Sequence, residues 1–251
     1  MRSIIANYDT FDYYVQNFLP DLIDDEVYFL SLSARNKYLT EEERKTLSLG
    51  RTEMFSRVIV RDKLSFDKAI RQLTANWSAR RTKNNMLVPQ KCLVCYININ
   101  PVSTIDATNR FFSEFSKANN ELMTSLIHKK QSNFDWFRFA DRKYQNCLQQ
   151  STSRKVLIDF DIDTKDFSVV YSLTNILQQR GVFYFIVKTH GGYHVLVERK
   201  SLNETKSGKE LFATFELLKK QHSNTEIMIN KNGMIPLPRS YQAGTEVSLI
   251  F

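Results

Sequence analysis

The chain has 251 residues, of which 42% are apolar and 12% aromatic, and its 35 lysines and arginines outnumber 27 acids to give a formal charge of +8. This composition indicates an ordinary folded protein with a sizeable core, and the basic charge makes polyanions candidate partners. No apolar run reaches the roughly 18 residues of a membrane span, and the N-terminus lacks a secretory pattern. We therefore expect a cytoplasmic protein that does not engage a membrane.

Three cysteines make an odd count, which argues against a disulfide framework. Cys92 and Cys95 have the spacing of half a zinc site, but they lie inside an apolar run, and no second pair of Cys or His follows at a suitable spacing. We expect these side chains to act as small buried hydrophobes, and we expect no zinc.

Segments rich in β-branched and aromatic residues alternate along the chain with segments of helical periodicity. The predicted strands are 27–32, 57–60, 92–99, 156–161, 182–188, 193–197 and 247–251. The predicted helices are 40–47, 66–76, 106–127, 136–149, 168–179 and 206–222. This alternation indicates an α+β or α/β architecture in which helices cover the sheets, and the lack of repeats or flexible linkers indicates a single domain.

A basic segment follows the second predicted helix. Arg80, Arg81 and Lys83 stand close to Trp77. An aromatic ring beside several cations can stack a base and hold phosphates. A basic loop after a helix explains the same residues, so both readings stay open.

The strand 156–161 reads Val-Leu-Ile-Asp-Phe-Asp and ends in two acids. Side chains two residues apart on a strand share a face, so Asp159 and Asp161 would project together. Two such charges repel unless a cation lies between them, and carboxylate oxygens suit hard ions such as Mg²⁺ or Mn²⁺. The alternative is a strand that ends in a solvated acidic turn, since Asp163 follows.

A glycine pair joins the apolar runs 182–188 and 193–197. This pattern predicts a hairpin whose backbone amides can approach a ligand. Lys188, Thr189 and His194 could line the end of the sheet beside the acids, where they would suit a triphosphate. Taken alone, the segment is better explained as a plain hairpin.

A third element contains Glu226, a turn at Asn232 and Gly233, and a proline-braced loop that carries Arg239. Prolines fix φ, so this loop should be stiff.

These three elements, in this order, resemble the archaeo-eukaryotic primase superfamily, particularly its small phage and plasmid members and the polymerase domain of bacterial repair ligases. The resemblance covers about residues 154–251. Asp159 and Asp161 match the Asp-x-Asp strand of that superfamily, and Gly192-Tyr193-His194 matches its hairpin element. Glu226 fits the later third acid, with Asp163 as the alternative ligand.

The resemblance implies a primase fold in one domain, with an RRM-like catalytic lobe at 151–251 packed against an N-terminal α/β lobe at 1–150. The implied activity is that of a DNA primase or primase-polymerase, which joins nucleoside triphosphates on a single-stranded DNA template with two Mg²⁺ or Mn²⁺ ions. The residues implied to hold the metal are Asp159, Asp161 and Glu226. Those implied to hold the nucleotide are His194, Lys188, Thr189, Gly192 and Arg239.

Near the middle of the chain, the segment 92–101 is similar to an early strand and turn of some phage members. There, Asn98 and Asn100 could contact template or primer, although a strand that ends in an Asn-Pro turn explains them as well. The resemblance also implies a phage or plasmid replicon and a separate helicase or other replication protein as partner.

Two other functions remain as alternatives. The first is a non-catalytic nucleic-acid-binding subunit with the same fold. The second is a phosphatase of the haloacid-dehalogenase type, which the sequence disfavours because its Asp-x-Asp lies past the middle of the chain and Asp163 stands where that family has Thr or Val.

Overall fold

The computed structural model describes residues 8–75, 79–82, 84–128, 136–230 and 233–250. Within these ranges the protein is an α+β structure with two five-stranded sheets and a two-stranded one, and every strand pair is antiparallel. The α+β class expected from the sequence is therefore confirmed. No helix in these ranges is both long and apolar enough to cross a membrane.

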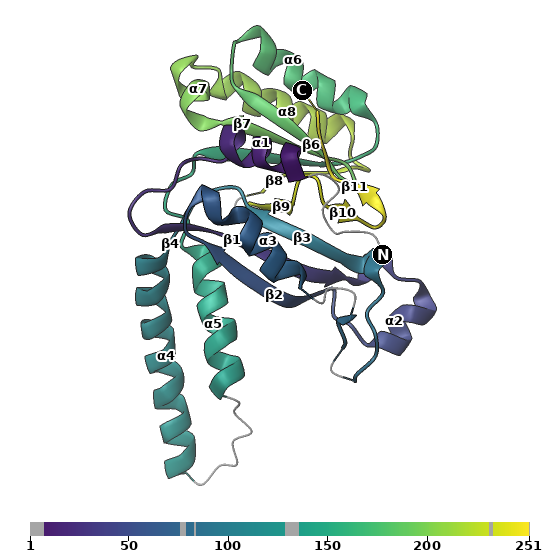
Figure 1. Cartoon of the computed structure of the whole chain (residues 1–251). Helices are drawn as coiled ribbons and strands as arrows, with labels where there is room; N and C mark the ends of the chain where they lie inside the picture. The colour runs from purple at the N-terminus through teal and green to yellow at the C-terminus, as the bar shows by residue number, and fades with distance from the viewer. Residues whose placement is uncertain (1–7, 76–78, 83, 129–135, 231–232, 251) are drawn as a thin grey trace.

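The N-terminal sheet has the order β2 (Thr52–Val60), β1 (Glu26–Arg35), β3 (Leu93–Asn98) and β9 (Met234–Pro236), and β4 (Val102–Ser103) pairs with one end of β1. One face packs against α1 (Tyr8–Phe18) and α3 (Phe66–Thr74), whose apolar side chains join those of β1 in a buried core. The other face meets α4 (Thr104–Ile127) and α5 (Trp136–Gln150), which project from the body as a long helical arm (Figure 1). The short helix α2 (Glu41–Leu47) lies between β1 and β2 in the chain.

The C-terminal sheet has the order β12 (Ser248–Ile250), β6 (Tyr184–Lys188), β7 (Tyr193–Glu198), β5 (Leu157–Asp163) and β8 (Glu226–Asn230). The helices α6 (Phe167–Gln179), α7 (Arg199–Glu204) and α8 (Gly208–Gln221) supply side chains to a second core over one of its faces. The two-stranded sheet is a hairpin of β10 (Tyr241–Gln242) and β11 (Thr245–Glu246).

The opposite face of the C-terminal sheet is turned towards the N-terminal lobe. Leu157, Phe185 and Leu196 on this face belong to the same hydrophobic core as β1, α1 and α3. Helix α1 contributes directly, with the ring centroids of Phe18 and Phe185 4.6 Å apart. Because side chains alternate along β5, residues 159, 161 and 163 share the face of Leu157, so the fold directs the acids towards the N-terminal lobe.

The sequence located most of the long elements within a few residues of their observed bounds. It missed α1, α7, β8 and the short strands β4, β9, β10 and β11. The position of β9 matters most, because a strand from the C-terminal part of the chain completes the N-terminal sheet. A division of the chain at residue 150 therefore does not separate the two lobes cleanly.

Candidate functional site

Strand β5 carries three acids on one face. In the antiparallel register, Asp161 lies opposite His194 of β7, and Asp163 lies opposite Glu226 of β8. Residues directly opposite each other in neighbouring strands project to the same side of a sheet. The expectation that Asp159 and Asp161 share a face is confirmed, and the register adds Asp163, Glu226 and His194 to it.

Asp159 and His194 form a buried pair. The Nδ1 atom of His194 lies 3.1 Å from both carboxylate oxygens of Asp159 and 3.8 Å from Asp161. Asp159 is completely buried, and His194 is 7% exposed. Burial alone lowers the pKa of His194, but the charge and hydrogen bond of Asp159 outweigh it and raise the pKa to about 9. His194 is therefore an imidazolium at neutral pH, and its contact with the Asp159 carboxylate fixes its position.

A cleft of about 390 Å³ opens between the two lobes, and one of its walls is acidic. Asp161, Asp163 and Glu226 line this wall, together with His194. Burial raises the pKa of Asp161, and the neighbouring carboxylates of Asp159, Asp163 and Glu226 raise it further against the opposing effect of His194. Negative charge is thus concentrated at a place where a bound cation would relieve the repulsion.

The facing wall is basic, and nothing in the sequence predicted it. Arg35 at the end of β1, Lys37 in the 3₁₀ turn that follows, and Arg51 just before β2 line this wall, with Tyr96 beside them. Arg35 donates a hydrogen bond of 3.0 Å to the Tyr96 hydroxyl. Among the described residues, no ion pair connects the basic wall with the acidic one.

The glycine hairpin brings β6 and β7 close to the end of β5. The amide of Thr189 donates to the carbonyl of Gly192 over 2.8 Å, which closes the turn. A side chain on Gly192 would collide with backbone atoms of residues 162 to 164, among them the amide nitrogen of Thr164 at 2.7 Å. Only glycine allows this approach, and as a result Thr189 and Gly191 reach the cleft.

Three of the expected nucleotide-binding residues, Lys188, Gly192 and Arg239, do not line the cleft. Lys188 pairs with Tyr193, and Val187 pairs with His194, so Lys188 is on the opposite face of the sheet from His194 and is exposed. Arg239 has a φ of 65° and forms an ion pair of 2.7 Å with Glu246. The predicted cradle therefore retains Thr189 and His194 and loses both cations.

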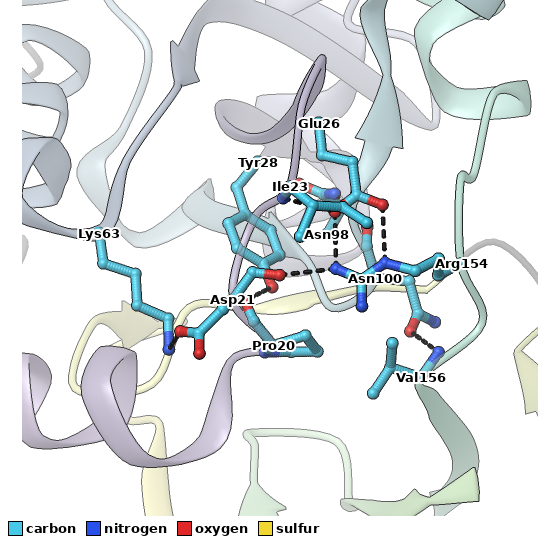
Figure 2. A network of polar contacts seen from close by, with 10 residues as sticks. All are labelled: Pro20, Asp21, Ile23, Glu26, Tyr28, Lys63, Asn98, Asn100, Arg154 and Val156. Atoms are coloured by element: carbon cyan, nitrogen blue, oxygen red, sulfur yellow. Dashed lines mark hydrogen bonds and ion pairs between the residues drawn. The ribbon is translucent and has the colours of Figure 1, made fainter. Parts of the chain in front are cut away.

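The side-chain amides of Asn98 and Asn100 form hydrogen bonds within the protein (Figure 2). Asn98 is 3% exposed, accepts a hydrogen bond from the amide of Phe29 and donates to the carbonyl of Asn100. Asn100 accepts from the amides of Val156 and Leu157, both over 2.8 Å, and donates to the carbonyl of Leu157 over 2.9 Å. These bonds connect β1, β3 and the start of β5. The alternative that a strand and turn explain both asparagines is the one that their placement supports.

No described residue of the basic segment after α3 lines the cleft. Arg80 donates to the carbonyl of Ala75, and Arg81 donates to the carbonyl of Asn85. Both guanidinium groups therefore form hydrogen bonds within their own segment of the chain. Trp77 and Lys83 lie outside the described residues. Contact of this segment with nucleic acid stays a prediction.

The cysteines are all buried and unpaired. Burial raises the pKa of Cys92 to about 11 and that of Cys95 to about 12, which keeps both thiols protonated at neutral pH. In the part of the chain that the structure describes, no three His, Cys, Asp or Glu side chains converge closely enough to hold a metal ion by themselves. Mg²⁺ does not need such a cage, because it commonly binds one or two carboxylates and completes its shell with water and substrate phosphates. The acidic wall fits that mode of binding.

Comparisons of this chain with protein-family models, with curated proteins and with solved structures gave no significant match.

Proposed function

We propose that this protein is a primase-polymerase that transfers nucleotides from nucleoside triphosphates onto a chain directed by a single-stranded DNA template. The observation that carries the proposal is the cleft with an acidic wall and a basic wall that form no ion pair with each other. A complex of a nucleoside triphosphate with a divalent ion has charges of both signs in one ligand. It would bring cations to the acidic wall and phosphates to the basic one.

The roles of the acids follow from their exposure. Asp161, Asp163 and Glu226 line the cleft and would hold Mg²⁺ or Mn²⁺, whereas Asp159 is buried against His194. When bound, such ions activate the attacking hydroxyl and neutralise the leaving pyrophosphate. Asp159 would then act through His194, because it fixes the orientation and the charge of the imidazole ring.

His194 is the residue best placed to bind phosphate from the acidic side. Its Nδ1 atom faces Asp159, which leaves Nε2 as the ring nitrogen available to a ligand in the cleft. An imidazolium donates a charge-assisted hydrogen bond to a phosphate oxygen. Arg35, Lys37 and Arg51 would bind the remaining phosphate oxygens from the other wall.

The arrangement of the C-terminal lobe agrees with the proposal. Its elements follow in the order β5, α6, β6, β7, α7, α8, β8, and four of its strands lie in the order β6, β7, β5, β8, as in an RRM-like sheet. The acids and His194 lie on the two central strands and an edge strand of this sheet. This is the expected position of the catalytic face in the superfamily that the sequence resembles.

One observation favours a second function, that of a non-catalytic nucleic-acid-binding subunit. Asp159, the first acid of the expected pair, does not line the cleft, and among the described residues no three His, Cys, Asp or Glu side chains form a group that could hold a metal ion. A protein that retains the fold without catalysis would show these features as well.

The deciding experiment is the incorporation of labelled nucleotides on single-stranded DNA with Mg²⁺ or Mn²⁺, with and without a primer. The wild type is compared with the double variant Asp161→Asn/Glu226→Gln and with Glu216→Gln, an exposed glutamate on α8 outside the cleft. We expect product from the wild type and the control, and none from the double variant. If the folded wild type binds single-stranded DNA and makes no product with either metal, the non-catalytic function replaces the one proposed.

A further inference from the structure

A second pocket lies at the opposite end of β5 from the end that carries Asp163. It has a volume of about 380 Å³ and lies between the start of β5, the end of β8 and the helices α7 and α8. This volume is within the range of about 300 to 1,000 Å³ that is typical of ligand sites. The function proposed above assigns no role to it.

The lining of this pocket combines an apolar floor with a basic rim. Phe212, Ile158 and Ile229 form the apolar part, and Phe212 is 38% exposed. Lys155 and Arg199 stand at the rim, and both are exposed. Within the described ranges, neither cation has a carboxylate partner. The pocket therefore offers an aromatic face and two uncompensated positive charges.

We propose that this pocket binds a nucleotide unit of a single-stranded polynucleotide, with the base against Phe212 and the flanking phosphates on Lys155 and Arg199. An aromatic platform beside cations is the arrangement by which proteins hold single strands without reading their sequence. Asn203 and Asn230 at the same pocket can donate and accept hydrogen bonds at the edge of a base. An apolar small molecule would make no use of the cations, and a free phosphate would make no use of the aromatic floor.

Strand β8 connects this pocket with the catalytic cleft. Asn230 belongs to the pocket and lies opposite Asp159, whereas Glu226 belongs to the cleft and lies opposite Asp163. The two residues are four positions apart, or about 14 Å along an antiparallel strand. Met228 lies between them, lines the cleft and is 39% exposed. Because β8 is the edge strand of its sheet, a polynucleotide could follow it from the pocket into the cleft.

The inference rests on the proposed function only for the strand that leads into the cleft, and binding in the pocket is measured separately. The first measurement is photocrosslinking of the full chain to oligothymidylate that carries 5-iododeoxyuridine, with the modified peptide identified by mass spectrometry. We expect an adduct in the segment that contains Phe212. Adducts confined to other segments would overturn the proposal.

The second measurement is the affinity for the same oligonucleotide by fluorescence anisotropy. Phe212→Ala should weaken binding about tenfold, as the loss of one stacked base does. Lys155→Gln together with Arg199→Gln should reduce the slope of log K against log salt by about 1.4, or about 0.7 for each phosphate contact on a single strand. The matched controls are Tyr171→Ala, an exposed aromatic on α6, and Lys200→Gln, the exposed neighbour of Arg199 that does not line the pocket.

Phe212 also contacts Phe160, so thermal unfolding of each variant is recorded, and the pair of cation variants provides the evidence if Phe212→Ala does not fold. If all variants bind the oligonucleotide as the wild type does, the pocket proposal fails, whether or not nucleotides are incorporated. If the variants lose affinity and the wild type incorporates no nucleotide, the pocket proposal stands and the proposed function fails.

Discussion

Two polar regions lie between the lobes, and they differ in how their polar groups find partners. The junction network, formed by Glu26, Asn98, Asn100 and Arg154, is internally complete. Arg154 donates to both carboxylate oxygens of Glu26, over 2.8 and 2.6 Å, and the amide of Ile23 donates to the same carboxylate (Figure 2). Such a network connects strands and needs no ligand.

The cleft presents the opposite case. Asp163 and Glu226 on one wall, and Lys37 and Arg51 on the other, have no hydrogen-bond or ion-pair partner for their charged groups among the described residues. Polar residues with complete internal partners hold a structure together, whereas charged residues gathered in a cleft without partners indicate a site that binds a charged ligand. Substitutions should therefore cost stability in the first region and activity in the second.

The largest effect is expected where the two types of region meet, at the acids of β5. Asp159→Asn should lower the free energy of unfolding by about 3 kcal/mol, because it leaves the buried imidazolium of His194 without its counter-charge. Asp163→Asn should change that free energy by less than about 0.5 kcal/mol and lower nucleotide incorporation about a hundredfold. Urea denaturation and the incorporation assay test both variants. Equal loss of stability in the two would contradict the distinction.

Asn100→Ala should give the next largest effect, and this effect should be on the free energy of unfolding alone. Two backbone amides and one carbonyl at the start of β5 would lose their partner, which should cost about 2 kcal/mol. Urea denaturation measures the loss, with the exposed Asn84→Ala as control. Weaker binding of single-stranded DNA at unchanged stability would instead support the direct contact that the sequence suggested.

Arg51→Gln tests the basic wall of the cleft. It should raise the KM for the nucleotide about tenfold, with little effect on kcat or on unfolding, because a charged hydrogen bond to phosphate is worth roughly 1.5 kcal/mol. Arg61→Gln is a matched control, since Arg61 is an exposed arginine that follows β2 just as Arg51 precedes it. Steady-state kinetics with varied nucleotide measure both. An equal increase in KM for both variants would mean that a general loss of positive charge causes the effect, and not the loss of a contact with phosphate.

Glu26→Gln should show the smallest effect and the clearest dependence on pH. Burial raises the pKa of Glu26, but hydrogen bonds from Arg154, Ser153 and the amide of Ile23 outweigh it and lower the pKa below its usual value. A lowered pKa stabilises the folded state above the unfolded pKa of about 4.3, and this contribution is lost as the pH falls through the folded pKa. The variant should be less stable than the wild type by about 1 kcal/mol at pH 7, because Arg154 is partly exposed, and the gap should close in acid. Urea denaturation at several pH values measures the gap, and a gap independent of pH would contradict the assignment.

The sequence predicted the features that depend on short-range patterns. Apolar runs located the long strands, and the spacing of Asp159 and Asp161 placed them on one face. The same rule of alternation could have excluded Lys188, since a turn that pairs it with Tyr193 must place it on the face away from His194. Arg239 could not be excluded in this way, because its left-handed φ and its ion pair with Glu246 depend on the β10 and β11 hairpin.

Features that depend on the meeting of distant segments could not be predicted. Arg35, Lys37 and Arg51 look like solvated charges until the fold places them opposite β5. Asn98 and Asn100 look like exposed turn residues until β5 supplies the amides that they bind. Nothing in the neighbouring sequence distinguishes these residues from others of their type.

The pairing of β3 with β9 has a consequence for the order in which the protein can fold. Tyr96 of β3 lies opposite Pro236 of β9, so most of the chain separates the two strands. During synthesis one edge of β3 stays unpaired until residues 234–236 have left the ribosome. Such distant pairing slows folding, and an exposed strand edge can pair with other chains. Expression of residues 1–150 alone should therefore give an aggregation-prone fragment, because the N-terminal sheet gains its last strand only in a chain that extends through β9.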